Sequence, residues 1–279
     1  MVYFMIYREI EGGVEITEVF DFDLAAIFKC GQCFRWVEDE SGVYCGVAFG
    51  RVVKVRLCGE TVFITCSIEE FEAVWRDYFD LDSDYSKIRE RICIDDYMRR
   101  ATDFGAGIRI LRQDKWEALC SFIISQNNNI PRIKKIIDML CRKFGEQIDF
   151  DGGVYFAFPS AERLAMLNEE DLEPLRCGYR SEYILNAAKA VASGVLDLDA
   201  LSRQPPDFAR AELKKLHGIG NKVADCVLLF GLHMLDLFPM DVWMKRTVLE
   251  QYGPGFDPSV FKPYAGIAQQ YIFHYARNC

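Results

Sequence analysis

The sequence predicts an α+β protein in which a β-rich N-terminal domain (residues 1–108) precedes a mostly helical region (residues 109–279). Apolar side chains alternate with a period of two in the first part, and they recur with helical spacing from about residue 110 onward. The chain has 279 residues, of which 51% are hydrophobic, so there is enough apolar material for the cores of about two domains.

The N-terminal alternation is clearest in residues 53–57 and 62–66, where hydrophobic side chains occupy every second position. This pattern is typical of antiparallel strands with one buried face. A helix follows, because Ser67 and Glu70 form a capping-box pattern and residues 71–79 place their large apolar side chains on one face.

Helical signals continue to the end of the chain. Asp114 is suited to cap a helix that runs through Ile123, and Asn129 to begin a second helix that stops at Gly145. We expect the remaining helices over residues 181–192, 207–216, 221–232, 241–252 and 263–276.

Composition limits the functional classes. The net charge of −9 argues against nucleic-acid binding, but residues 109–143 carry eight Lys/Arg against three Asp/Glu, so one face can still be basic. No segment approaches the roughly 18 apolar residues of a membrane span, and the N-terminus lacks the features of a secretion signal. Eleven cysteines without regular spacing indicate reduced thiols. We therefore expect a protein of the prokaryotic cytoplasm.

The segment from residue 213 to 247 carries the strongest chemical signal. Gly218 and Gly220 join two helices, and their spacing permits a tight turn with positive φ. The turn exposes backbone N–H groups at the start of the second helix, where an anion such as a DNA phosphate binds. An ordinary connection between two helices is the alternative interpretation.

Lys222 lies in the first turn of that second helix, where the helix dipole disfavours a cation. A neutral, partly desolvated lysine is a nucleophile that can form a Schiff base. Asp241 follows Pro239 at the N-cap position of the next helix. A phosphate-binding surface lysine and a plain N-cap would explain the two residues separately, but together with the glycine hairpin they favour a catalytic pair.

These residues resemble the helix–hairpin–helix (HhH-GPD) DNA glycosylase superfamily, and further segments resemble its 8-oxoguanine DNA glycosylase/AP lyase branch. The similar segments are Gly31-Gln32-Cys33-Phe34-Arg35-Trp36, Ser125-Gln126-Asn127-Asn128-Asn129, Cys177-Gly178-Tyr179-Arg180 and residues 263–269. The resemblance spans about residues 20–275. It implies a TBP-like antiparallel β-sheet N-terminal domain packed on a two-part all-α glycosylase region.

The resemblance implies a base-excision repair enzyme that acts on double-stranded DNA containing 8-oxoguanine opposite cytosine. We expect a monomer, because one active site completes the chemistry. Its DNA substrate implies that it is associated with the nucleoid. The damaged base would be flipped out of the helix. Lys222 would attack C1′ and displace the base, and the resulting Schiff base would allow β-elimination on the 3′ side. Asp241 would stabilise the cationic sugar and help Lys222 to become neutral.

By the same resemblance, the base pocket consists of Gly31, Cys226, Pro239, Gln269 and Phe273. In 8-oxoguanine N7 carries a hydrogen, whereas in guanine it is an acceptor, so the backbone carbonyl of Gly31 would attract one and repel the other. Cys226 and Phe273 would sandwich the base and Gln269 would bind its Watson–Crick edge. Core packing is the alternative interpretation for Cys226 and Phe273.

The resemblance also implies a set of DNA-binding residues: Asn127, Arg132, Tyr179, Arg180, Gly218 and Gly220. The first four would fill the vacated base stack and read the orphaned cytosine. A solvated helix face is the alternative interpretation for Arg132. Trp243 is a departure, because animal members of the family carry a histidine there near a phosphate, and an indole has no charge.

No cofactor is required by the implied chemistry. The backbone carbonyls of Lys214, Leu216 and Ile219 would hold a structural monovalent cation or calcium ion. Only Cys279 follows Cys226, so the iron–sulfur cluster of related branches is not expected. The three histidines lack metal-site spacing, so zinc is not expected either.

Two other functional classes stay open at the level of sequence. One is a glycosylase that acts on alkylated bases or on another oxidised purine, which a lesion panel would identify. The other is a binding module that uses the hairpin only to hold DNA, and such a protein would leave the base attached. A glycosylase without lyase activity would require that Lys222 be blocked.

Overall fold

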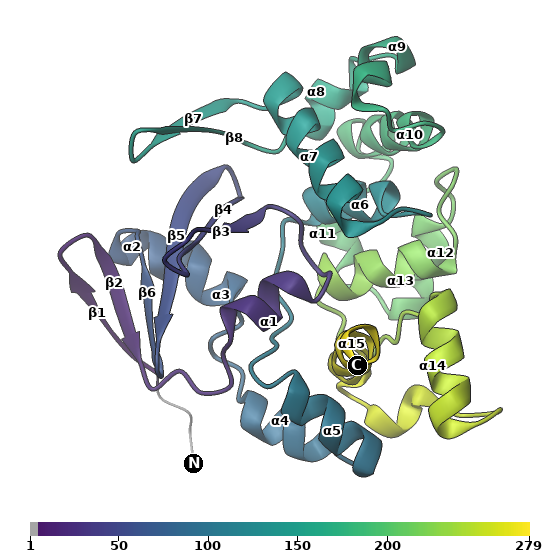
Figure 1. The fold of residues 1–279 in the computed structure, drawn as a ribbon. Helices are drawn as coiled ribbons and strands as arrows, with labels where there is room; N and C mark the ends of the chain where they lie inside the picture. Colours follow the sequence, from purple (N-terminus) through teal and green to yellow (C-terminus); the bar gives the residue numbers. More distant parts are fainter. Residues whose placement is uncertain (1–4) are drawn as a thin grey trace.

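The structure, a computed structural model, describes residues 5–279, so the first four residues of the expected β-rich domain lie outside the described residues. The N-terminal part contains a six-stranded antiparallel sheet in the order β1-β2-β6-β5-β4-β3 (Figure 1). Its strands are β1 (Ile6–Ile10), β2 (Gly13–Thr17), β3 (Trp36–Glu38), β4 (Tyr44–Ala48), β5 (Arg51–Cys58) and β6 (Thr61–Ile64). The two strands expected from the sequence coincide with β5 and β6.

One face of this sheet packs against helix α1 (Leu24–Lys29) and against a helical segment that follows β6. That segment consists of α2 (Ile68–Glu70), the π-helical turn η1 (Phe71–Trp75) and α3 (Arg76–Tyr78). The hydroxyl of Ser67 accepts a hydrogen bond from the backbone N–H of Glu70 and thereby caps the segment, as expected, but the Glu70 carboxylate accepts from the indole N–H of Trp75 and does not complete the expected capping box. The buried aromatic side chains of this segment share one hydrophobic cluster with the inward residues of the sheet.

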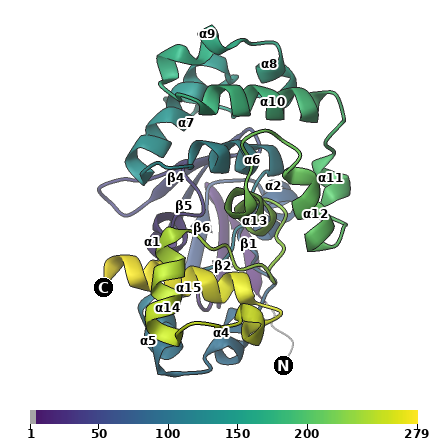
Figure 2. The same cartoon turned by 90° about the vertical axis from the view of Figure 1, so that its right-hand side faces the viewer.

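The rest of the chain is mostly helical (Figures 1 and 2). The helices are α4 (Tyr85–Ile92), α5 (Asp96–Phe104), α6 (Lys115–Ile124), α7 (Ile130–Phe144), α8 (Ala161–Ala165), α9 (Glu169–Leu172), η2 (Glu173–Leu175), α10 (Arg180–Ala192), α11 (Leu198–Leu201), α12 (Pro206–Leu213), α13 (Asn221–Phe230), α14 (Val242–Tyr252), η3 (Pro258–Phe261) and α15 (Ala265–Asn278). In both views α13 lies between α6, α7 and α10 on one side and α14 and α15 on the other. These two groups of helices flank the hairpin that begins α13.

Helices α4 and α5 belong to the core of the helical region, although they precede residue 108. Tyr85, Met98 and Ala101 are buried in the same cluster as Tyr271 and Ile272 of α15. The apolar faces of these two helices therefore pack on the last helix of the chain and not on the sheet. The division between the two cores accordingly does not coincide with the expected division of the sequence.

A β-hairpin interrupts the helical region, where the sequence pattern predicted no strands. It consists of β7 (Gln147–Phe150) and β8 (Gly153–Phe156), joined by a turn at Asp151-Gly152. The hairpin reaches back to the N-terminal sheet (Figure 1), where Lys54 of β5 pairs with Asp151. The hydroxyl of Tyr155 and the thiol of Cys45 lie 3.5 Å apart in the same contact.

Within residues 5–279, no helix is long and apolar enough to cross a membrane. All eleven cysteines are unpaired, and burial raises the pKa of several of their thiols, including Cys30 and Cys226 to about 11. These thiols are therefore protonated at neutral pH.

Candidate active site

A small cavity joins residues from four distant parts of the chain. Its volume is about 50 Å³, and it is lined by Gly31, Phe122, Lys222, Cys226, Phe230, Pro239, Asp241, Gln269, Gln270 and Phe273. Both predicted catalytic residues and all five predicted base-pocket residues are in this set. The cavity has room for about one or two water molecules. The pocket is therefore assembled but nearly closed in this conformation.

Lys222 reaches the cavity from the first turn of α13. Its ammonium group lies 5.8 Å from the centre of the Phe122 ring, which stacks on Phe230 with the ring centres 5.2 Å apart. Lys222 forms no ion pair with any carboxylate in the part of the chain that the structure describes. The amine is thus held beside aromatic rings and not in an ion pair with a described carboxylate.

Asp241 is the N-cap residue of α14. Its Oδ1 accepts a hydrogen bond from the backbone N–H of Met244 at 2.7 Å, which fixes the carboxylate at the start of the helix. The side chain also borders the cavity, so the same conformation of Asp241 caps the helix and places the carboxylate at the cavity. A fixed negative charge in this position is suited to stabilise a cation that develops in the cavity.

Gln269 supplies an unused acceptor to the cavity. Its side chain is 5% exposed, and its Oε1 has no hydrogen-bond partner within residues 5–279. A buried amide oxygen without a partner costs free energy unless a ligand donates to it. The cavity therefore offers a specific site for an N–H group.

Gly31 lies next to the ring of Phe273. The residue has a φ of +89°, and a Cβ built on it would lie 3.5 Å from Cε1 of Phe273. Only glycine adopts this backbone conformation without strain. Cys226, whose side chain is buried, and Pro239 complete the apolar walls.

The hairpin before α13 uses its two glycines differently. Gly218 has a φ of +83°, and a Cβ there would lie 2.3 Å from the ring of Tyr183, so both the turn and the close approach require glycine. Gly220 has a φ of −91°, so the expectation of a positive φ was wrong for this residue. Gly220 is instead the N-cap of α13, and it provides no side chain to cap the first N–H groups.

The three hairpin carbonyls expected to bind a cation lie close together in sequence around this turn. The carbonyl of Leu216 accepts a hydrogen bond from the N–H of Ile219 at 3.2 Å, which closes the turn. Each carbonyl oxygen has two lone pairs, so this bond leaves Leu216 able to accept again. Lys214 is the C-cap of α12.

Three of the predicted DNA-binding side chains form an exposed group. Asn127 and Arg132 are exposed on the α6–α7 loop and on α7, and Tyr179 is 46% exposed before α10. The amide of Asn127 donates to the hydroxyl of Tyr179 at 3.3 Å, and Arg132 donates to the carbonyl of Arg176 at 3.1 Å. A polar, partly aromatic surface is therefore available beside the cavity-lining helix α6.

Arg180 differs from the expectation that it faces DNA. Its side chain is 4% exposed, and the guanidinium donates to the backbone carbonyls of Gln126, Asn127 and Cys177. Two of these carbonyls belong to the α6–α7 loop, in which Asn127 has a φ of +45°. In this conformation Arg180 supports the Asn127 loop from inside.

Trp243 and Val242 extend the surface beside Asp241. They are 53% and 85% exposed in the first turn of α14. Trp243, which stands where animal members of the family carry a histidine, thus forms an exposed apolar pair with Val242. A surface of this kind suits contact with a deoxyribose more than an ionic contact with a phosphate.

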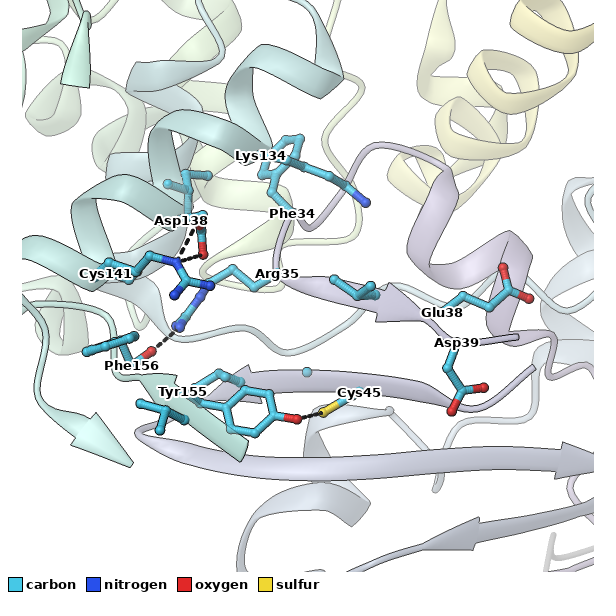
Figure 3. Close-up of a pocket in the computed structure, with 16 residues that line it drawn as sticks. Phe34, Arg35, Glu38, Asp39, Cys45, Lys134, Asp138, Cys141, Tyr155 and Phe156 are labelled. Carbon is cyan, nitrogen blue, oxygen red and sulfur yellow. Dashed lines mark hydrogen bonds and ion pairs between the residues drawn. The ribbon is translucent and has the colours of Figure 1, made fainter. Parts of the chain in front are cut away.

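A second and larger cavity, of about 550 Å³, lies apart from these residues between β3, β4, α7 and β8 (Figure 3). Its most buried charged group is Arg35, which pairs with Glu117 at 3.1 Å and donates to the carbonyl of Phe156. Burial raises the pKa of Glu117 although Arg35 opposes the shift. The Arg35 contacts connect the β7–β8 hairpin to α6, and none of the predicted site residues lines this cavity.

The structure adds three residues that sequence reasoning did not identify as part of the site: Phe122, Phe230 and Gln270. The two phenylalanines occur in apolar helix stripes and carried no signal. The pair Gln269-Gln270 did carry one, because two adjacent amides interrupt an otherwise apolar helix. Polar side chains at buried positions usually serve hydrogen bonds.

Comparison with known protein families divides the chain into two matched parts. Residues 15–119 match the 8-oxoguanine DNA glycosylase N-terminal domain, and residues 120–258 match the HhH-GPD superfamily of base excision DNA repair proteins. An N-glycosylase/DNA lyase of Saccharomyces cerevisiae is 34% identical over 255 residues, which cover 82% of this chain and 68% of that protein.

Two solved structures are similar over nearly the full length of both chains. A structure of MBOgg1 in complex with a low affinity DNA ligand has 43% identity, a TM-score of 0.95 and 99% coverage of each chain. The 8-oxoguanine glycosylase/lyase of Clostridium acetobutylicum, in complex with double-stranded DNA containing cytosine opposite 8-oxoG, has 39% identity, a TM-score of 0.93 and 99% coverage of each chain.

Proposed function

The chain belongs to the HhH-GPD superfamily of base excision DNA repair proteins as an 8-oxoguanine DNA glycosylase/lyase, and we propose the following route for its reaction. The substrate is double-stranded DNA in which 8-oxoguanine is opposite cytosine. The enzyme excises the base through attack by Lys222 and then cleaves the strand by β-elimination.

The observation that carries this proposal is the composition of the small cavity. An unpaired amine (Lys222), a fixed carboxylate (Asp241) and an unused buried acceptor (Gln269) meet in one place. A binding module that only holds DNA has no need for this combination. Attack on a sugar carbon next to a bound base uses the amine as the nucleophile, the carboxylate to stabilise the developing positive charge and the acceptor to hold the base.

In the excision step, the lone pair of the Lys222 nitrogen forms a bond to C1′ of the deoxyribose. The bond from C1′ to the base breaks, its electron pair leaves with the base, and the base takes up the proton that the lysine nitrogen loses after it bonds to C1′. Positive charge develops on the sugar as this bond breaks, and the Asp241 carboxylate stabilises it. The developing charge is the reason for an anion that is held rigidly at a helix N-terminus.

In the lyase step, the covalent adduct opens to a Schiff base between Lys222 and C1′. The iminium makes the C2′ hydrogen acidic, so a base removes it and the electron pair of that C–H bond is held as an enamine. The enamine then returns the pair to form a C2′=C3′ double bond, and the C3′–O bond breaks with its electrons leaving on the 3′ phosphate. The strand is thus broken on the 3′ side of the lesion. Both steps use the same nitrogen atom, so a single substitution at Lys222 removes both.

Base recognition rests on four groups around the cavity. The carbonyl of Gly31 accepts the N7 hydrogen that distinguishes 8-oxoguanine from guanine. The free Oε1 of Gln269 accepts from the Watson–Crick edge, and Phe273 and Cys226 cover the two faces of the base. Since the cavity now holds only about 50 Å³, the ring of Phe273 moves outward when the base enters.

The opposite strand is read by the exposed group formed by Asn127, Arg132 and Tyr179. Tyr179 wedges into the stack and Arg132 donates to the acceptors of the orphaned cytosine, which favours cytosine over other bases. Arg180 acts from inside by holding the Asn127 loop. A direct contact from Arg180 to the cytosine requires that it first release the loop carbonyls.

The hairpin holds the DNA backbone. The uncapped N–H groups that follow Gly220 bind a phosphate at the N-terminus of α13, where the helix dipole favours an anion. The carbonyls of Lys214, Leu216 and Ile219 are oxygen donors of the kind that a monovalent cation or calcium prefers. A cation bound there adds charge next to the same phosphate.

Borohydride trapping tests the proposed function. The protein is mixed with duplexes that carry 8-oxoguanine opposite each normal base, and borohydride reduces any Schiff base to a stable protein–DNA adduct. We expect an adduct with the lesion-containing duplex, strongest opposite cytosine, and none with Lys222→Gln. Gel retardation of the same duplexes serves as the control for DNA binding.

Two results would contradict the proposal. Release of free base without a covalent adduct would mean that water, and not Lys222, displaces the base. Retardation of DNA without release of base or adduct would favour the binding-module interpretation. A duplex panel with alkylated purines, run in parallel, would reveal a different substrate class.

A further inference from the structure

The peptide between Gly31 and Gln32 presents the carbonyl that reads N7, and its orientation is fixed from both sides. Gly31 itself supplies no restraint, because it has no side chain and a φ of +89°. A glycine is the most mobile residue in a chain unless its neighbours are held. Discrimination by one carbonyl therefore depends on what holds the adjacent peptides.

On the N-terminal side, the holding group is Gln270 of α15. Its Nε2 donates to the carbonyl of Cys30 at 2.6 Å, and both residues are 2% exposed. A carbonyl only accepts hydrogen bonds, so the amide nitrogen must face it. In a buried environment the bond has no competition from water, and its loss leaves the Cys30 carbonyl without this donor.

On the C-terminal side, two more glutamines hold the chain. Gln113 donates to the carbonyl of Gln32 at 2.8 Å. The side chain of Gln32 is fully buried, donates to the carbonyl of Arg109 at 2.7 Å and accepts from the N–H of Leu111 at 2.9 Å. The peptides before and after Gly31-Gln32 are thus both fixed to other elements.

Helix α15 also fixes the spacing between the carbonyl and the rest of the pocket. Gln269, Gln270 and Phe273 lie within five consecutive positions of this helix. The acceptor for the Watson–Crick edge, the restraint on Cys30 and the ring beside the base therefore move together. A shift of α15 would alter all three contacts at once.

We propose that Gln270 is a positioning residue that sets the discrimination for the N7 hydrogen by orienting the Gly31 carbonyl. The inference rests on the proposed function, in which that carbonyl reads N7. Gln270 does not touch the base in this account, and it acts through the backbone of residues 30–32. Its removal should therefore weaken the choice of substrate more than the chemistry at the sugar.

The test compares two bases that differ at position 7. Duplexes carry either 8-oxoguanine or 8-oxo-7-deazaguanine, which has a CH₂ group where the first has N–H, and single-turnover excision rates are measured for both. In Gln270→Met the side chain keeps its length but loses the donor. We expect the preference for 8-oxoguanine over the deaza base to fall about fivefold relative to wild type.

Thr102→Val is the matched control, because it also removes a buried donor next to α15. Thr102 of α5 is 2% exposed and donates to the carbonyl of Met98 at 2.9 Å. This variant should lose thermal stability while its preference between the two bases stays that of wild type. A ratio of rates is used because a general loss of stability or folded fraction affects both substrates equally.

The outcomes are distinguishable. If wild type excises 8-oxoguanine but Gln270→Met keeps the full preference, the positioning role is refuted while the proposed function stands. If wild type releases no 8-oxoguanine, the proposed function fails and the positioning role fails with it. If Gln270→Met does not fold, Gln270→Asn, whose shorter side chain moves the donor away from the Cys30 carbonyl, replaces it, and a full preference there refutes the inference.

Discussion

The carboxylate of Asp241 accepts a hydrogen bond from the backbone N–H of Met244 at 2.7 Å, so the residue that lines the cavity is also the first restraint on α14. The two roles of Asp241 are separable, because asparagine caps a helix about as well as aspartate but carries no charge. Two substitutions at Asp241 therefore distinguish its effect on stability from its effect on activity.

Asp241→Asn should retain the unfolding free energy of wild type to within about 0.5 kcal/mol and lower the excision rate at least about a hundredfold, because only the charge is lost. Asp241→Ala should lose the same activity and, in addition, about 1 kcal/mol of stability. Urea unfolding and single-turnover excision measure the two quantities. Wild-type activity in Asp241→Asn would show that Asp241 is a cap only.

The two hairpin glycines should respond in opposite ways. Gly218→Ala places a Cβ 2.3 Å from the Tyr183 ring at a φ of +83°, so we expect a loss of about 2 kcal/mol or more in stability. Gly220→Ser meets nothing within 4 Å and adds a side-chain cap to α13. It should keep or raise the melting temperature.

Gly220→Ser should nevertheless weaken DNA binding, because its hydroxyl bonds to the N–H groups that the phosphate would otherwise use. Fluorescence anisotropy with a labelled duplex measures the affinity, and thermal unfolding measures the stability. Undiminished affinity in Gly220→Ser would exclude the N-terminus of α13 as the phosphate site.

Substitutions of Arg180 and Arg132 should differ in their effects on stability and on the preference for the opposite base. Arg180→Met removes the donor from three loop carbonyls, so we expect a loss of about 2 kcal/mol in unfolding free energy. Arg132→Met changes an exposed side chain and should stay within about 0.5 kcal/mol of wild type. Only the second should lose the preference for cytosine at full stability, and excision opposite each base tests this.

Stability should decrease as the pH is lowered from neutral. Burial lowers the pKa of His233 against the opposing charge of Asp80, and Arg112 acts in the same direction as burial. Because the pKa of His233 is lower in the folded state, the unfolded protein binds the proton more tightly than the folded protein does. The contribution of His233 to the unfolding free energy is therefore fully present above its ordinary pKa of about 6.5 and decreases as the pH falls below that value. Urea unfolding at about pH 7.5 and about pH 5.5 measures the change.

His233→Asn should reduce this pH dependence. His233 has a φ of +53°, which asparagine tolerates better than most residues. Part of the slope should remain, because burial also lowers the pKa of His274. An unchanged slope in His233→Asn would mean that the residue is as accessible to protons in the folded state as in the unfolded state.

Local patterns in the sequence were sufficient to find most of the site. The capping residues Ser67, Asp114, Asn129 and Asp241 all begin helices, because a cap is a contact over three residues and leaves a signature at that distance. The resemblance placed the pocket residues Gly31 and Phe273 on one cavity although the sequence separates them by nearly the whole chain.

Features that depend on distant contacts were not predictable in the same way. Strands β7 and β8 are too short for their alternation to predict them. The Asp151-Gly152 pair between them is nevertheless typical of a hairpin turn. The inward position of Arg180 had no local signal, because two of its three carbonyl partners, Gln126 and Asn127, belong to a loop more than fifty residues earlier. Only the folded chain shows which surface such a side chain faces.

The order in which the chain is synthesised gives the arrangement of the cavity a biological consequence. Gly31 leaves the ribosome early, whereas Gln269, Gln270 and Phe273 belong to the last helix. A nascent or prematurely terminated chain can form its sheet and many of its helices, but it lacks one wall of the pocket and the partner of α5. An unfinished copy that ends before α15 therefore carries Lys222 and Gly31 without Gln269 and Phe273, in a fold that quality control can recognise as incomplete.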